Sequence, residues 1–75
     1  MQEIYTDLEK TLPPHVQRLR DEQKELVYKM DKLYIFMDSS PVYQELSQLE
    51  KTLLAVQYKA MDTYNECLKQ RIFYS

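Results

Sequence analysis

Apolar residues recur along this chain in alternating steps of three and four, which is the spacing of one face of an α-helix. The first run, interrupted once by a glutamine, is Val16, Leu19, Gln23, Leu26, Met30, Leu33 and Met37. The second run follows Ser39-Ser40-Pro41 and is Val42, Leu46, Leu49, Leu53, Val56, Ala60, Thr63 and Cys67. Two helices joined by a short break pack as antiparallel neighbours. We therefore expect these two runs to form the seam of a helical hairpin.

Prolines mark the expected helix boundaries. The residue before a proline avoids the α region, so Leu12-Pro13-Pro14 ends a first helix, while proline itself fits the first turn of the next helix. Ser40 is a good N-cap and Pro41 a good first residue for a third helix. The predicted elements are helices over residues 1–12, 13–39 and 40–75, in a single domain over residues 1–75. The predicted fold class is all-α, a short N-terminal helix followed by a long antiparallel hairpin.

The third helix carries a second apolar stripe, formed by Leu54, Tyr58, Met61, Tyr64, Leu68 and Ile72. One stripe covers one partner helix, and a hairpin supplies only one. A chain of 75 residues also buries too little surface to be stable easily by itself. We therefore expect a homo-oligomeric helical bundle. The predicted interface between copies is Leu54, Tyr58, Met61, Tyr64 and Leu68.

Two polar residues, Gln23 and Thr63, interrupt the expected seam. A buried polar residue can fix the register of paired helices through a hydrogen bond. The other interpretation is that these positions line a pocket that holds water. The spacing leaves both interpretations open.

Composition excludes several classes of function. The chain has no glycine, which P-loops and dinucleotide fingerprints need. Ten basic and twelve acidic residues give a net charge of −2, against the basic surface of duplex-binding proteins. One cysteine and one histidine provide neither an intrachain disulfide nor a zinc site, and no apolar stretch is long enough to span a membrane. No secretory signal is visible, and a lone thiol suits a reducing compartment, so we expect a cytoplasmic protein.

The sequence contains few candidates for catalytic residues. His15 and Cys67 would lie at the same end of an antiparallel hairpin, but Cys67 belongs to the expected seam, where a thiol is usually inert. The carboxylates are spread along the chain without a pair suited to acid–base catalysis. We expect no catalytic residues, no cofactor and no metal site.

Tyrosine is abundant, with seven residues against two phenylalanines and no tryptophan. Most of them fit packing or interface positions. Tyr5, Phe73 and Tyr74 differ because they lie outside the seam, at the end of the hairpin where the helix termini meet. Basic residues near that end are Arg18, Arg20, Lys69 and Arg71. Aromatic rings beside arginines can stack a base and pair with phosphate, although an ordinary bundle end has the same composition.

Two sets of residues carry a resemblance to a known family. They are Arg18–Leu26, Lys29–Leu33 and Phe36-Met37 in the first half, and Leu53-Leu54, Gln57, Ala60-Met61, Tyr64, Leu68 and Arg71-Ile72 in the second. Over residues 16–72 the chain is similar to small helical-hairpin proteins of tailed phages and prophages, related to a crAss-like phage protein. Ser40-Pro41-Val42-Tyr43 replaces that family's acidic, phenylalanine-containing connection. The resemblance implies a phage accessory protein in an infected bacterium.

The expected order of helices also resembles the phage anti-CBASS sponges. These hexamers sequester cyclic oligonucleotide signals with an aromatic ring and a basic residue at subunit junctions. The resemblance implies that Tyr5 is the stacking ring and that Arg18 or Arg20 contacts phosphate.

These observations lead to two functional hypotheses. The first is a counter-defence protein that sequesters a cyclic di- or trinucleotide messenger in a homo-oligomer, with Tyr5, Arg18, Arg20, Arg71, Phe73 and Tyr74 as ligand-binding residues. The second is an inhibitor or adaptor that presents an apolar helix stripe to a host protein. Neither requires duplex nucleic acid or a membrane.

Overall fold

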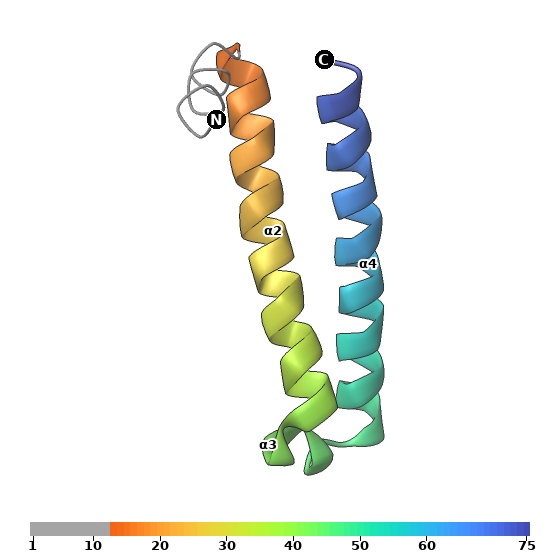
Figure 1. The fold of residues 1–75 in the computed structure, drawn as a ribbon. Helices are drawn as coiled ribbons and strands as arrows, with labels where there is room; N and C mark the ends of the chain where they lie inside the picture. Colours follow the sequence, from red (N-terminus) through yellow and green to blue (C-terminus); the bar gives the residue numbers. More distant parts are fainter. Residues whose placement is uncertain (1–12) are drawn as a thin grey trace.

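The computed structural model describes residues 13–75, which form an antiparallel helical hairpin (Figure 1). The helices are α2 (Pro14–Ser39), α3 (Pro41–Gln44) and α4 (Gln48–Phe73). The long helices α2 and α4 have 26 residues each, about 39 Å at 1.5 Å per residue. They lie side by side, with α3 at the turn between them (Figure 1). The predicted all-α hairpin is confirmed, while the predicted helix over residues 1–12 lies outside the described residues.

The turn contains two helix starts where one was predicted. Ser40 caps α3 as expected, because its side-chain oxygen accepts the Val42 backbone N–H at 3.2 Å. Ser47 caps α4 in the same way, accepting the Glu50 N–H at 3.2 Å and donating its own hydroxyl to the Glu50 carboxylate at 3.0 Å. A serine followed three residues later by glutamate is the signature of a helix start. The prediction of one continuous helix over residues 40–75 is therefore corrected to two helices.

The core of the hairpin runs along the predicted seam of α2. Val16, Leu19, Leu26 and Met30 are all buried. On α4 the facing residues are Leu54, Tyr58, Met61, Asn65, Leu68 and Ile72, of which Asn65 and Leu68 are buried and the others half-buried. Tyr58, Met61 and Ile72 pack against the buried cluster around Leu68. We call these six residues of α4 the inner stripe.

The predicted seam of α4 faces away from α2, which is a correction. Leu49, Leu53 and Val56 leave 68%, 59% and 59% of their surface exposed, and Cys67 is exposed as well. We call Leu49, Leu53, Val56, Ala60, Thr63 and Cys67 the outer stripe. Both stripes have heptad spacing, so periodicity could not decide between them. Side-chain size does distinguish the two stripes. Toward the C-terminus the inner stripe keeps large side chains, where the outer stripe has Ala60, Thr63 and Cys67. Larger side chains bury more apolar surface, which favours the inner stripe as the one that packs on α2.

Because the inner stripe packs on α2, the residues predicted at an interface between copies have a different role. Leu68 lies in the buried core, Tyr58 and Met61 pack against it, and Leu54 is half-buried. Tyr64 remains partly open, with 42% of its surface exposed. The apolar stripe of α4 that stays open to another chain is therefore the outer stripe.

A hydrogen bond between the long helices lies within the core. Gln23 donates from Nε2 to the Oδ1 atom of Asn65 at 3.2 Å, across the hairpin. The pair joins residues 42 positions apart, so it matches one turn of α2 to one turn of α4. This geometry favours the register interpretation of Gln23. Thr63 is exposed and donates to the Lys59 carbonyl of its own helix, so it is not part of the seam.

Truncating Leu68 tests where the core lies. Leu68→Ala should lower the free energy of unfolding by about 2–5 kcal/mol, because its side chain is 0% exposed and its removal leaves a cavity. Ile35→Ala is the matched control on α2, where the side chain is 61% exposed, and we expect a much smaller change. Urea unfolding followed by circular dichroism measures both. Equal losses for the two variants would contradict the assignment of the core.

The hydrogen-bonded pair makes a second prediction for stability. Asn65→Leu should destabilise the hairpin by about 1–3 kcal/mol, since it leaves the Gln23 amide partly buried without its partner. The double variant Gln23→Leu/Asn65→Leu should recover most of that loss, because no polar group then remains unpaired. Urea midpoints of the two single variants and the double variant form the cycle. Additive effects in that cycle would show that the two residues do not interact.

Candidate functional site

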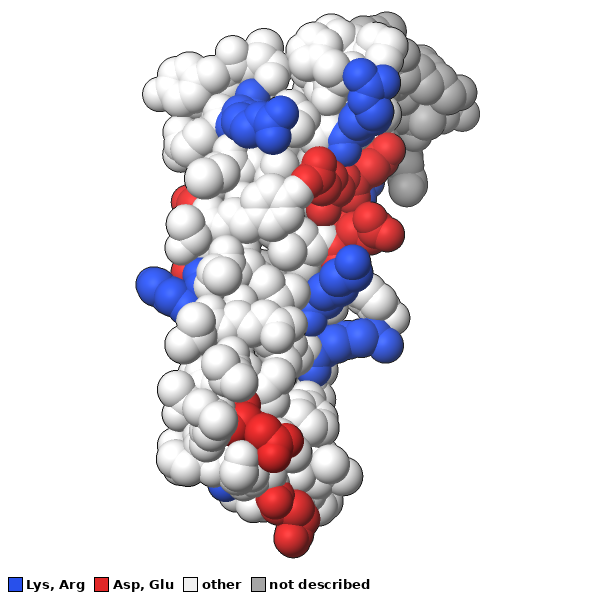
Figure 2. Space-filling model, turned by 180° about the vertical axis from the view of Figure 1, so that it is seen from behind, with Lys and Arg blue, Asp and Glu red and all other residues white. Residues whose placement is uncertain are grey.

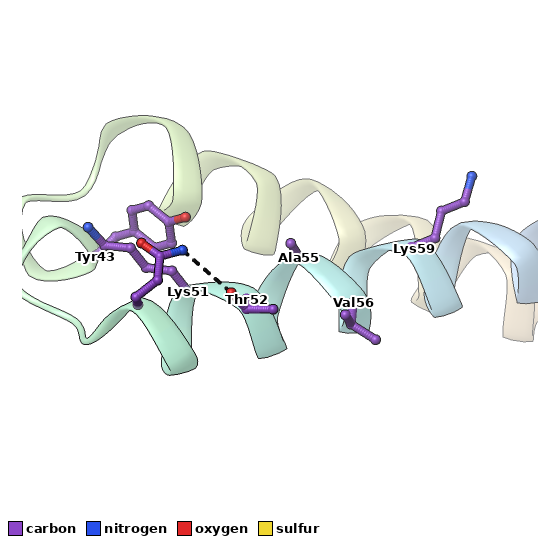
Figure 3. Close-up of a pocket in the computed structure, with 7 residues that line it drawn as sticks. Tyr43, Lys51, Thr52, Ala55, Val56 and Lys59 are labelled. Atoms are coloured by element: carbon purple, nitrogen blue, oxygen red, sulfur yellow. Dashed lines mark hydrogen bonds between the residues drawn. The ribbon is translucent and has the colours of Figure 1, made fainter.

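A groove near the turn brings aromatic and basic side chains together. Its lining residues are Tyr43, Gln48, Lys51, Thr52, Ala55, Val56 and Lys59, and its volume is about 560 Å³. Small-molecule sites commonly have volumes of this order, although they are usually more enclosed. Figure 3 shows Tyr43 of α3 over the beginning of α4, with Lys59 farther along the same helix. The short helix α3 thus supplies the ring, and α4 supplies the cations.

The local contacts order the end of the groove nearest the turn. The Lys51 ammonium nitrogen lies 5.4 Å from the centroid of the Tyr43 ring, within the range of a cation–π contact. The ring also packs edge-on against Phe36 of α2, with centroids 5.9 Å apart. Gln48 donates from Nε2 to the Thr52 hydroxyl at 3.5 Å (Figure 3). The groove therefore offers a held ring, two ammonium groups and polar hydrogen-bonding groups beside an apolar floor.

The groove adjoins the outer stripe. Val56 belongs to both, and Figure 3 shows it pointing to the side of α4 away from Ala55 and Lys59. Lys59 is exposed and Lys51 half-buried. A second chain packed on the outer stripe would consequently lie next to this groove.

The other candidate surface is the open end of the hairpin, where the predicted ligand residues lie. Arg18 is exposed and Arg20 half-buried in the first turns of α2, while Arg71 is exposed in the last turn of α4. Phe73 and Tyr74 are highly exposed and pack edge-on against each other, with centroids 4.9 Å apart. Tyr5 lies outside the described residues. The structure thus brings the two C-terminal rings together at the end of α4, the helix that also carries Arg71.

Charge is distributed unevenly over one face of the molecule (Figure 2). Basic side chains lie near the open end on both long helices, and acidic side chains follow them along α2 (Figure 2). Much of the surface between the charged groups is uncharged. The open end can attract an anion, whereas the groove that combines an aromatic ring with lysines lies near the turn.

The residues considered for catalysis occupy exposed positions. His15 and Cys67 are both exposed, and Cys67 lies on the outer stripe instead of in the core where it was predicted. Within the described range, no three of the His, Cys, Asp and Glu side chains cluster in a way that could hold a metal ion. No helix of that range has the length and apolar content needed to cross a bilayer.

Sequence reasoning missed two features of the site. Tyr43 was counted only among the packing tyrosines, and Lys51 and Lys59 were not singled out. Their spacing along α4 would have placed Lys51, Ala55 and Lys59 on one face, but the contribution of Tyr43 depends on the separate helix α3. The signal that α3 and α4 are separate helices was Ser47 followed by Glu50, the pair that caps the start of α4. Asn65 was missed because it is polar, and the prediction followed apolar positions. It interrupts an inner stripe that is otherwise apolar.

Comparison with known proteins gives a family. The family model described as Sequestin matches residues 13–74, which include all three described helices. No curated protein and no solved structure matches the chain.

Proposed function

The chain belongs to the Sequestin family, and we propose that it binds a ligand stoichiometrically and holds it without chemical conversion. The family's name supports a sequestering role. The match spans the whole hairpin, which supports a role for the hairpin as a unit. We propose further that the ligand is a cyclic oligonucleotide, a messenger of bacterial immunity, and that the protein serves a phage as a counter-defence factor.

The groove beside Tyr43 is the observation that carries this proposal. A cyclic oligonucleotide presents flat bases and negatively charged phosphates in one compact molecule. An aromatic ring stacks on a base regardless of its identity, and a lysine ammonium pairs with phosphate. Tyr43, Lys51 and Lys59 supply these groups along one groove. Sequestering such a ligand requires binding groups and no reactive group, and the groove supplies binding groups.

A protein partner is the alternative function, and the exposed outer stripe favours it. Leu49, Leu53 and Val56 could be covered by a helix of a host protein, as when an amphipathic helix packs into an apolar groove. A host protein that binds the wild-type chain directly, but not Leu53→Glu, would support this alternative. The groove with its two lysines is not explained by it.

Titration calorimetry with a panel of cyclic di- and trinucleotides tests the ligand class. We expect one member to bind, and we expect Lys59→Ala to weaken that binding about 10-fold or more, the usual loss for a charge-assisted contact. Lys29→Ala, which removes an exposed lysine of α2, is the matched control and should bind as the wild type does. The ligand should be recovered chemically intact after the protein is denatured.

Other outcomes of this titration separate the parts of the proposal. Loss of binding in Arg71→Ala or Phe73→Ala, with Lys59→Ala unaffected, would place the ligand at the open end instead of in the groove. A recovered ligand that has been cleaved would contradict sequestration. No heat with any nucleotide of the panel would overturn the proposed ligand class.

A further inference from the structure

The residues of the outer stripe of α4 have a symmetric spacing, which is the same counted from either end of the stripe. Its successive steps are four, three, four, three and four, from Leu49 to Cys67. No charged residue occupies any of its six positions. Leu49, Leu53 and Val56 leave more than half of their surface open. This is a helix seam without a partner within residues 13–75.

The side chains of the outer stripe change in size along its length. The half nearest the turn consists of Leu49, Leu53 and Val56, and the other half of Ala60, Thr63 and Cys67. A parallel pair of such helices would place large side chains on large ones and leave gaps between the small ones. An antiparallel pair centred near residue 58 places every large side chain opposite a small one. Facing layers that alternate large and small side chains pack at high density.

We propose that α4 pairs with α4 of a second copy, antiparallel and around a two-fold axis near residue 58. Leu49 then faces Cys67 of the partner subunit, Leu53 faces Thr63 of the partner subunit, and Val56 faces Ala60 of the partner subunit. Each layer occurs twice, as an isologous two-fold interface requires. A partner of unrelated sequence would not explain why the two halves of the stripe complement each other.

This pairing also completes the groove. Antiparallel packing brings the same flank of both α4 helices together on one side, so the two grooves join end to end. Lys59 and Lys59 of the partner subunit meet beside the axis, where their like charges oppose pairing. An anion with two phosphates would relieve that repulsion from both sides. This step rests on the proposed function and deepens it, because it makes a two-fold site for a cyclic dinucleotide at the junction.

Disulfide trapping tests the pairing and its direction. Leu49→Cys adds one thiol, and diamide serves as the oxidant. We expect dimers in which position 49 of one chain is bonded to Cys67 of the other, identified by peptide mass mapping. They should form roughly 10-fold faster than cross-links in the control Ile35→Cys, because pairing raises the effective concentration of facing thiols. The wild type should cross-link slowly, since its two Cys67 thiols would lie about 27 Å apart along the helices.

Each other outcome has a defined meaning. Cross-links between identical positions would show parallel pairing and overturn the proposal, as would a rate equal to that of Ile35→Cys. A cyclic dinucleotide should speed the trapping of Leu49→Cys, and a nucleotide that binds without this effect would overturn the joined groove. Trapping without any nucleotide binding would leave the pairing intact and contradict only the proposed ligand. Nucleotide binding without trapping would contradict the pairing and leave the proposed ligand intact.

Discussion

A helix with one neighbour can bury one stripe, and this constraint governs the molecule. The helix α4 carries two apolar stripes, and α2 covers only the bulkier one, around Leu68. The other remains exposed from Leu49 to Cys67. Burial of a Leu or Val side chain stabilises a fold by about 1.5–3 kcal/mol, so the uncovered stripe represents a substantial unused driving force. Both the proposed assembly and the site beside it follow from that surplus.

The fold was largely predictable because heptad spacing, prolines and a serine cap specify helices locally. The seam of α2 and the cap at Ser40 agree with the sequence-based prediction. Spacing could not decide which stripe of α4 faces α2, since both satisfy it. That choice depends on side-chain volume matched across the hairpin, and on the hydrogen bond between Gln23 and Asn65. The sequence therefore identified most residues of both stripes but exchanged their partners, and it placed Tyr64 in the stripe where Asn65 is buried instead.

The candidate site was less predictable than the fold. The spacing of basic residues on a helix can be read from sequence, but a groove depends on what lies above it. Tyr43 contributes because α3 ends at Gln44 and α4 begins only at Gln48, which leaves the ring over the beginning of α4 (Figure 3). The open end, in contrast, was predicted from chain topology, and among residues 13–75 the structure joins only Phe73 and Tyr74 there by direct ring contact. Sequestration needs a binding surface, such as the groove, and no reactive group. This agrees with the match to the Sequestin family.

Sedimentation equilibrium of the wild type and of Val56→Glu is the most direct test of the central claim that α4 needs a second chain. The variant places a charge in the middle of the outer stripe without touching the core around Leu68. We predict that the wild type sediments as a dimer or a multiple of it at micromolar concentrations. The variant should sediment as a monomer with unchanged helical circular dichroism. A wild-type chain that remains monomeric at every concentration would contradict the account.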